Sequence, residues 1–371
     1  MSKRILVARA ADAANLNAQA KNAQNILRRW RSTEYRPSVL AFGEPDAGIA
    51  ANPNVDLIRL RPDRWWRAVL FALYLRRWDG VFYPGLHHRA DWLALKARRA
   101  LGRSVPIVTT IEGLIGSVAH DRAEAFFEAQ AGHKVYAGKL PAAELKRYND
   151  LSAMSDRIIA ISPFLARMAR TQFGDKVDML PLGVDLRLFE TRAPATNARP
   201  RVIGAGTVYA RKRPEMFVRL AAQFRDADFA WFGDGDLRAG ILAEIAREGL
   251  DNLQFLPPVP PERLAEEMAK SDILVLPSFA EGVPKVTQEA AAAGLAQIVY
   301  GFYEAPTVAD GVNGFVVWND EELRDRLSQL LADRDLTRRF GDAGRRMAQA
   351  WSWDVVAPQW EAAIIAACAA R

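Results

Sequence analysis

The stretch ILVLPSFAEGVPKVTQEAAAAG, residues 273–294, decides the fold of the second half of this 371-residue chain. Its first four residues form an apolar run that predicts a buried strand. The following loop contains Gly282, which lets the backbone approach a ligand closely. Pro284 is predicted to be the first helical residue, because the N–H it lacks needs no partner there, and Gly294 is predicted to end the helix. A helix that starts at the end of a strand offers free N–H groups, so we expect an anion site here.

Two glutamates lie on either side of the start of this helix. Glu281 lies in the loop, from which it can reach a sugar ring, and Glu289 lies in the second helical turn. An ionised carboxylate only accepts hydrogen bonds, so Glu289 suits the two hydroxyls of a ribose. The alternative is a solvated loop acid together with a Lys285–Glu289 surface pair at i,i+4 spacing, which contributes only a few tenths of a kcal/mol.

Short apolar runs alternate with longer helical patterns along the whole chain. This alternation predicts βαβ units, and therefore an α/β protein with two Rossmann-like parallel-sheet domains. Ligands of such folds bind at the carboxyl ends of the strands. The strands are expected at 5–8, 38–41, 80–83, 106–110 and 157–161 in the first half, and at 201–204, 229–232, 253–256, 273–276 and 297–300 in the second.

The chain length suits two domains rather than one. Residues 191–200 are poor in apolar side chains and rich in proline, which is typical of a linker. We therefore expect an N-terminal domain at 1–190, a C-terminal domain at 201–350 and a last helix within 351–371. The tryptophans around this helix are interpreted as packing residues.

Charge is distributed unevenly along the chain. Residues 1–190 hold 29 Lys and Arg against 19 Asp and Glu, a net charge of +10, within a total of +6. Such an excess predicts anionic partners. Nucleic acid is not expected, because zinc-ligand spacing and RNA-binding aromatic signatures are missing from the sequence. The single cysteine, Cys368, permits no disulfide within the chain and favours a cytoplasmic setting.

Residues 59–78 are rich in arginine and tryptophan around a short apolar centre. One interpretation is an amphipathic helix in a membrane interface, with arginines at anionic head groups. The other is a core helix with basic ends. The basic N-terminal half favours the first, so we expect a peripheral position on the inner face of the cytoplasmic membrane. No apolar run in the sequence approaches the ~20 residues of a membrane span, and 5–8 is too short for a signal peptide.

The run Glu281-x7-Glu289 resembles the E-x7-E motif of retaining glycosyltransferase family 4, the largest GT-B family. Pro277-Ser278 before it and Val308 to Val316 after it, which is similar to the family's e-x-v-x-d-g-x-N-G segment, extend the resemblance. It implies the GT-B fold, with the last helix crossing back to the N-terminal domain. It also implies transfer of a hexose-type sugar from a nucleoside-diphosphate sugar, without an obligatory cofactor or metal. The implied acceptor is a glycan or lipid-linked glycan in cell-surface polysaccharide or lipopolysaccharide synthesis.

Residues 204–214 resemble the family's G-R-x-x-x-x-K-G run. Lys212 matches the lysine that contacts the donor pyrophosphate, whereas Thr207 stands where the family usually has an arginine. Arg211, Arg213 or Lys285 is expected to supply the missing charge; the alternative is a basic loop that starts a surface helix. Asp234-x-Asp236 is interpreted as a turn near the nucleotide rather than a metal site. The resemblance implies these donor-binding residues: Glu289, Gly282, Val283, Pro284, Lys285, Gly206, Thr207, Arg211 and Gly233.

In the N-terminal half, residues 108–113 resemble the family's v-x-t-x-H-g run, with Glu112 in place of the histidine. Glu112 is expected to accept a hydrogen bond from a sugar hydroxyl or from the acceptor. It completes the predicted catalytic set with Glu281 and Lys212. Glu281 is expected to position the donor sugar and not to act as a nucleophile. His87, His88 and Asn15 are candidate acceptor contacts, with ordinary loop residues as the alternative.

Three other functions compete with this interpretation. A GT-B sugar-nucleotide epimerase shares the fold and differs in its product. A non-catalytic GT-B scaffold that binds nucleotide sugars would explain the departures at Thr207 and Glu112. A nicotinamide oxidoreductase is disfavoured, because Tyr209 stands where its Gly-x-Gly-x-x-Gly fingerprint needs the third glycine.

Overall fold

The structure of the chain is a computed structural model. It describes residues 2–8, 10–14, 18–60, 78–84, 89–102, 105–113, 142–189 and 198–370, together with 125, 128, 129 and 132. The chain divides into two compact units. Unit 1 contains Met1–His120, Lys139–Gly183 and Trp353–Arg371, and unit 2 contains Asp121–Gly138 and Val184–Ser352.

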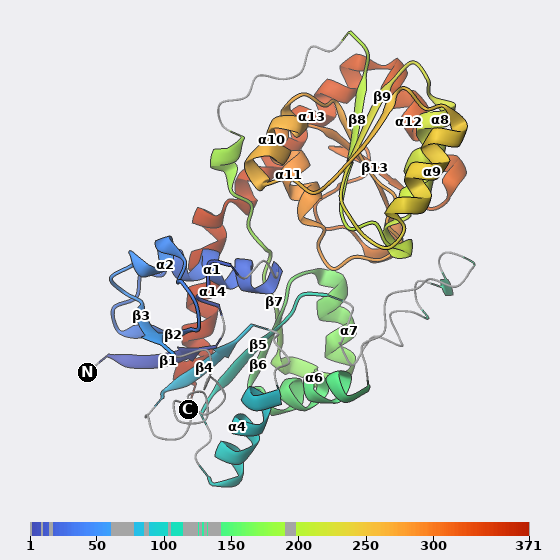
Figure 1. Ribbon diagram of the computed structural model, residues 1–371. Helices are drawn as coiled ribbons and strands as arrows, with labels where there is room; N and C mark the ends of the chain where they lie inside the picture. The colour runs from blue at the N-terminus through green and yellow to red at the C-terminus, as the bar shows by residue number, and fades with distance from the viewer. Residues whose placement is uncertain are drawn as a thin grey trace. The chain divides into compact units, whose positions relative to one another are not determined.

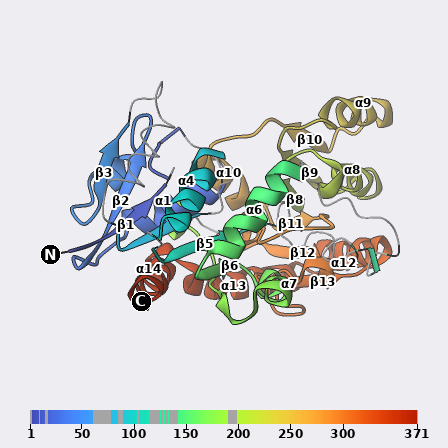
Figure 2. The same cartoon turned by 90° about the horizontal axis from the view of Figure 1, so that it is seen from below.

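Unit 1 is built on a seven-stranded parallel sheet with the order β3-β2-β1-β4-β5-β6-β7 (Figure 1). Helices α4, α6 and α7 lie at the β5–β7 side of the sheet, a grouping that can also be followed from below in Figure 2. The strands are β1 (Lys3–Val7), β2 (Tyr35–Ala41), β3 (Asp56–Arg59), β4 (Gly80–Tyr83), β5 (Ile107–Ile111), β6 (Arg157–Ala160) and β7 (Val177–Met179). The helices are α1 (Ala18–Arg28), α2 (Ala47–Ala50), α4 (Arg89–Ala100), α6 (Ala142–Met154), α7 (Pro163–Phe173), η2 (Gly174–Lys176) and α14 (Trp353–Ala369).

Helix α14 belongs to unit 1, although the whole of Val184–Ser352 precedes it in the sequence. Trp360 is buried, and its indole N–H donates to the carbonyl of Pro181 at 2.8 Å. The Glu361 carboxylate accepts hydrogen bonds from the backbone N–H groups of Arg31 and Ser32, just after α1. The interpretation of the tryptophans as packing residues is confirmed for Trp353 and Trp360, which are 3% and 1% exposed.

Unit 2 is built on a six-stranded parallel sheet with the order β10-β9-β8-β11-β12-β13. Figure 1 shows α8 and α9 on one face of this sheet and α10, α11 and α13 on the other. The strands are β8 (Arg201–Ala205), β9 (Asp228–Phe232), β10 (Leu253–Leu256), β11 (Ile273–Leu276), β12 (Ala296–Tyr300) and β13 (Gly314–Val317). The helices are η3 (Leu186–Leu188), η4 (Ala210–Lys212), α8 (Pro214–Gln223), α9 (Arg238–Glu248), α10 (Pro261–Ala269), α11 (Lys285–Ala293), η5 (Gly301–Tyr303), α12 (Asp320–Ala332), α13 (Arg334–Ala348) and η6 (Gln349–Trp351).

The strand order of unit 2 reverses between β8 and β11, which pair directly. The chain winds from β8 outward through β9 to β10, and then crosses back to β11 and winds outward the other way. In a doubly wound sheet the crevice for a ligand opens at the carboxyl ends of the two strands where the order reverses. The predicted class of two parallel-sheet α/β domains is confirmed, and its switch point in unit 2 lies between the loops that follow β8 and β11.

The alanine-rich half of residues 273–294 allows two helices to pack closely. Helix α11 lies against α13, where a Cβ added to Gly341 would come within 2.0 Å of the Gly294 carbonyl oxygen. Gly294 ends α11 in the left-handed region, with φ 80°, as predicted. The prediction that Pro284 is the first helical residue is wrong by one position. Its ψ of 110° is extended, and its carbonyl accepts hydrogen bonds from the backbone and hydroxyl of Thr287, so Pro284 caps a helix that begins at Lys285.

In the described part of the chain, no helix is both long enough and apolar enough to cross a membrane. Residues 61–77, the greater part of the segment predicted to meet a membrane surface, lie outside the described residues. The membrane interpretation therefore stays a prediction.

Candidate functional site

The loops after β8 and β11 are joined at the switch point of unit 2. The backbone N–H of Phe279 donates to the carbonyl of Arg211 at 3.1 Å. The Arg211 guanidinium in turn donates to the carbonyl of Ala280. These bonds hold η4, with its basic residues, beside the loop that carries Glu281.

The Glu281 carboxylate is shared by two cations. Lys212 Nζ lies 2.5 Å from Glu281 Oε1, and Arg211 Nη1 lies 3.0 Å from Oε2. Glu281 is 7% exposed. Burial raises the pKa of Glu281, but the charges of Lys212 and Arg211 outweigh it and hold this pKa below its ordinary value. Glu281 is therefore ionised at neutral pH and acts only as a hydrogen-bond acceptor.

Glu289 lies on α11 in a different environment. Its side chain is partly buried, and within the described chain no hydrogen bond or ion pair involves its carboxylate. Burial raises the pKa of Glu289, and the charge of Lys285 only partly opposes this effect. A desolvated carboxylate without a donor is poised to accept hydrogen bonds from a ligand.

Two glycines bring the loops after β8 and β9 into contact. Gly206 has φ 149°, a conformation that favours glycine, and a Cβ added to Gly233 would lie 1.9 Å from the Gly206 carbonyl oxygen. The remaining predicted donor residues are placed on the same strand ends: Thr207 exposed after β8, and Gly282, Val283, Pro284 and Lys285 between β11 and the first turn of α11.

Arg213 does not have the role expected for it. It was predicted as one source of the charge missing at Thr207, but its guanidinium is bound to the carboxylate of Asp320 at 2.8 and 2.7 Å. It also donates to the Tyr300 hydroxyl at 2.9 Å and is 9% exposed. The expectation that Arg213 presents a cation to a ligand phosphate is therefore wrong, and Arg211 and Lys212 are the basic residues that reach Glu281.

Sequence reasoning missed Tyr303 in η5, directly after β12. Its hydroxyl is fully buried and has no hydrogen-bond partner among the described residues. Burial raises the pKa of Tyr303 well above its usual range, and the negative charge of Glu281 adds to the effect. No motif marks this residue; the only signal is its position just after a buried strand end.

In unit 1, Glu112 follows β5 directly. Its carboxylate accepts hydrogen bonds from Asn22 Nδ2 on α1 at 2.5 Å and from the Thr110 hydroxyl at 3.0 Å. These two donors fix the orientation of the carboxylate. The candidate acceptor residues His87, His88 and Asn15 lie outside the described residues.

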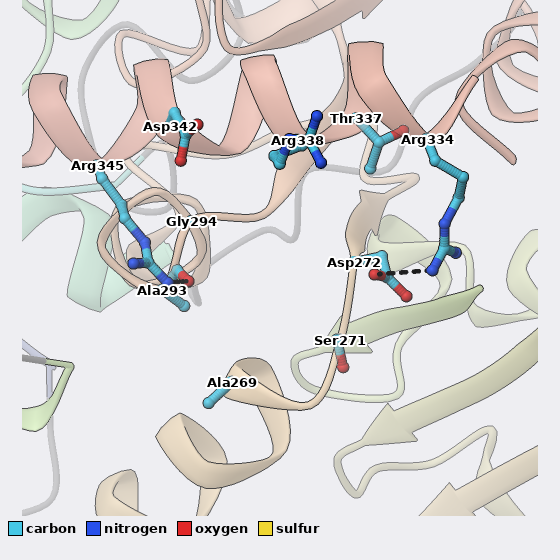
Figure 3. Close-up of a pocket in the computed structure, with 10 residues that line it drawn as sticks. All are labelled: Ala269, Ser271, Asp272, Ala293, Gly294, Arg334, Thr337, Arg338, Asp342 and Arg345. Carbon is cyan, nitrogen blue, oxygen red and sulfur yellow. Dashed lines mark hydrogen bonds and ion pairs between the residues drawn. The ribbon is translucent and has the colours of Figure 1, made fainter. Parts of the chain in front are cut away.

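A pocket of about 210 Å³ opens at the other edge of the unit 2 sheet, at the amino ends of β11 and β12 (Figure 3). Its three arginines, Arg334, Arg338 and Arg345, have partners already. Arg334 lies 3.8 Å from Asp272, and Arg345 donates to the Ala293 carbonyl at 2.8 Å, as the dashed lines in Figure 3 mark. It contains no residue predicted for the site, so its position and pairing separate it from the cluster around Glu281.

Two family descriptions match the sequence: "Glycosyltransferase Family 4" over residues 19–188 and "Glycosyl transferases group 1" over residues 199–333. A D-inositol 3-phosphate glycosyltransferase of Nocardia farcinica is 34% identical over 229 residues, which cover 54% of this chain and 50% of that protein. The homologous protein of Nocardiopsis dassonvillei is 28% identical over 57% of this chain and 56% of its own length. The chain thus spans about half the length of these curated relatives.

Solved structures agree on the fold. Sucrose-phosphate synthase from Thermosynechococcus elongatus superposes with a TM-score of 0.75 at 18% identity, over 100% of both chains. Anabaena HepE in complex with UDP and glucose gives 0.68 at 15% identity, over 99% of this chain and 100% of its own. At these identities the likeness shows the fold, and it agrees with the class predicted from the sequence.

Proposed function

Because the chain belongs to the group 1 glycosyltransferases of family 4, we propose that it transfers a hexose-type sugar from a nucleoside-diphosphate sugar to an acceptor with retention of configuration. The observation that carries the proposal is the cluster of Glu281, Arg211 and Lys212 at the switch point of unit 2, beside the start of α11. This arrangement combines a sugar-binding acid with two cations and a helix N-terminus, which are the groups that a diphosphate sugar needs.

The cations stabilise the charge that grows on the departing diphosphate. Lys212 and Arg211 provide two positive charges, and the N-terminus of α11 adds the positive end of its helix dipole. Fixed charges in a partly buried site stabilise a transition state more than they do in water. When a diphosphate takes over these cations, the oxygens of Glu281 become available to hydroxyls of the donor sugar.

Glu289 accepts hydrogen bonds from the ribose in this proposal. Its carboxylate is desolvated and makes no hydrogen bond to the described protein, so two ribose hydroxyls would satisfy it. Glu281 and Glu289 thus have separate tasks, one at the sugar and one at the nucleoside.

The separation of tasks can be measured. Thermal shift with UDP, GDP, ADP and dTDP identifies the nucleotide, and activity is then assayed with the matching sugar donor. We expect Glu281→Ala to lower kcat about 100-fold with little change in nucleotide affinity, and Glu289→Ala to weaken nucleotide binding about tenfold. Wild-type activity in both variants would refute the site. A product that is an altered nucleotide sugar would instead indicate an epimerase, and binding without transfer would indicate a scaffold.

The proposed acceptor is a glycan or lipid-linked glycan of cell-surface polysaccharide or lipopolysaccharide synthesis, held at an anionic membrane surface by residues 59–78. The net charge of +10 over residues 1–190 supports an anionic acceptor or surface. The curated relatives are named for inositol 3-phosphate, so that compound belongs in the acceptor assay beside lipid-linked glycans. Pelleting with phosphatidylglycerol vesicles at low salt tests the proposed binding to an anionic membrane. A protein that stays in the supernatant would refute it.

A further inference from the structure

Arg213 has a backbone conformation that is unfavourable for its residue type. Its φ and ψ are 50° and 52°, in the left-handed region, and Glu304 is the only other non-glycine residue of the described chain with positive φ. A side chain in this region costs free energy that glycine would avoid. A conformation of this kind persists only when surrounding contacts hold it, and such residues concentrate at functional sites.

The contacts that hold Arg213 come from three different elements. The guanidinium forms a two-pronged ion pair with Asp320, the first residue of α12, and a hydrogen bond with Tyr300 at the end of β12. It also lies over the ring of Phe279, 4.2 Å from the ring centroid, in the loop after β11. The Tyr300 hydroxyl donates to Asp320 and closes the network.

Three consecutive basic residues therefore bind three consecutive residues of the opposite loop. Arg213 lies on the Phe279 ring, Arg211 binds Ala280 and Glu281, and Lys212 binds Glu281. Of the three, only Arg213 has a further bidentate anchor in α12. Its left-handed turn ends η4 and starts α8, so it sets the angle at which η4, the segment that contains Arg211 and Lys212, joins α8.

We propose that Arg213 is a positioning residue for the diphosphate of the donor. The contacts of the Arg213 side chain with Asp320 and Phe279 fix Lys212 and Arg211 in the orientation that receives the phosphates. Arg213 itself stays buried and touches no ligand. This inference rests on the proposed function, because it assigns the way in which the cations of the donor site are held in place.

A double-mutant cycle tests the inference. Isothermal titration uses the nucleoside diphosphate that binds the wild type, paired with its monophosphate, for example UDP with UMP. We expect Arg213→Gly to weaken UDP binding roughly tenfold and UMP binding much less, because the β-phosphate loses its oriented cations. Once Lys212→Ala has removed the main cation, Arg213→Gly should add little further loss. The proposal would be overturned if the affinity losses of the two single variants added up in the double variant, or if Arg213→Gly weakened UDP and UMP binding equally.

Two further variants separate positioning from simple stability. Arg201→Gln breaks a comparable ion pair, Arg201–Glu267 at 2.6 Å, at the amino end of β8 in the same unit, and should leave UDP and UMP affinity unchanged. Asp320→Asn removes the anchor without changing the backbone of residue 213, so it covers the case in which Arg213→Gly does not fold. It should also weaken UDP binding more than UMP binding. Equal effects on the two affinities would count against the proposal. A wild type that binds none of UDP, GDP, ADP and dTDP would instead refute the proposed function.

Discussion

At Glu289, stability and ligand binding make opposite demands on one side chain. Burial raises the pKa of this carboxyl, so the folded protein holds its ionised form at a cost at neutral pH. An acid with a raised pKa gains stability as pH falls through that pKa and loses it as pH rises. The residue that suits a ribose therefore weakens the protein that carries it, as is common at functional sites.

Glu289→Gln should reveal this conflict. We expect the free energy of unfolding at pH 7 to rise by about 1 kcal/mol, since the amide has no charge to desolvate, while nucleotide affinity falls. Urea unfolding at pH 7 and at pH 5 measures the first effect, and the advantage of the variant should shrink at the lower pH. A variant that is less stable than wild type at pH 7 would show that the carboxylate makes a stabilising contact instead.

The local sequence of the second unit is enough to predict five of its six strands, but neither β13 nor the long-range contacts of Arg213. The apolar run of β11 and the stop at Gly294 follow from neighbouring residues alone. Pro284 is misplaced by one residue, because its extended ψ depends on the loop before it. Arginine carries no signal for a left-handed backbone, and the partner that holds Arg213, Asp320, lies 107 residues further along the chain.

At the scale of elements, the Arg213–Asp320 pair joins η4 to the first turn of α12 and makes their contact dependent on pH. Hydrogen bonds from Arg213 hold the pKa of Asp320 at about 2, below its ordinary value of 3.8. A lowered acid pKa gives stability that is fully present above the ordinary value and is lost as pH falls towards the lowered one.

Asp320→Asn should remove this pH-dependent part. Because the Asp320 side chain is 36% exposed, solvent screening limits its contribution to about 1 kcal/mol. We expect the variant to be less stable than wild type by that amount at pH 6, and the difference to shrink as pH falls from 4 towards 2. Urea unfolding at a series of pH values measures the difference, and a gap that stays constant down to pH 2 would contradict the assignment.

For the whole molecule, the division into two units predicts that a substitution in one core lowers the thermal stability of that unit first. Trp360 of unit 1 and Trp231 of unit 2 are both fully buried, 1% and 0% exposed. We expect Trp360→Ala to cost about 3–5 kcal/mol and to lower one calorimetric transition, while the transition that nucleotide stabilises stays in place. Trp231→Ala is the matched control and should give the reverse pattern. A nucleotide-sensitive transition that falls equally in both variants would contradict independent units.

The linker predicted at 191–200 shows how far sequence reasoning reaches at this scale. Composition alone favours a break in the proline-rich stretch, but Val184 and Phe189 pack into the core of unit 2, and the Val184 N–H donates to the carbonyl of Trp351. Which side of a linker a residue packs on is decided by contacts with residues distant in the sequence. Local composition does not encode such contacts.

Helix α14 has a consequence for the order in which the chain is made. It packs against α1, β4 and β5, yet its residues are made after the whole of Val184–Ser352. During translation the sheet of unit 1 lacks this cover until α14 emerges, by which time every residue of Val184–Ser352 is available to fold. Unit 2 is thus free to reach its native state before the unit that precedes it is complete. Until α14 is made, the surfaces of α1, β4 and β5 that it covers lack their packing partner.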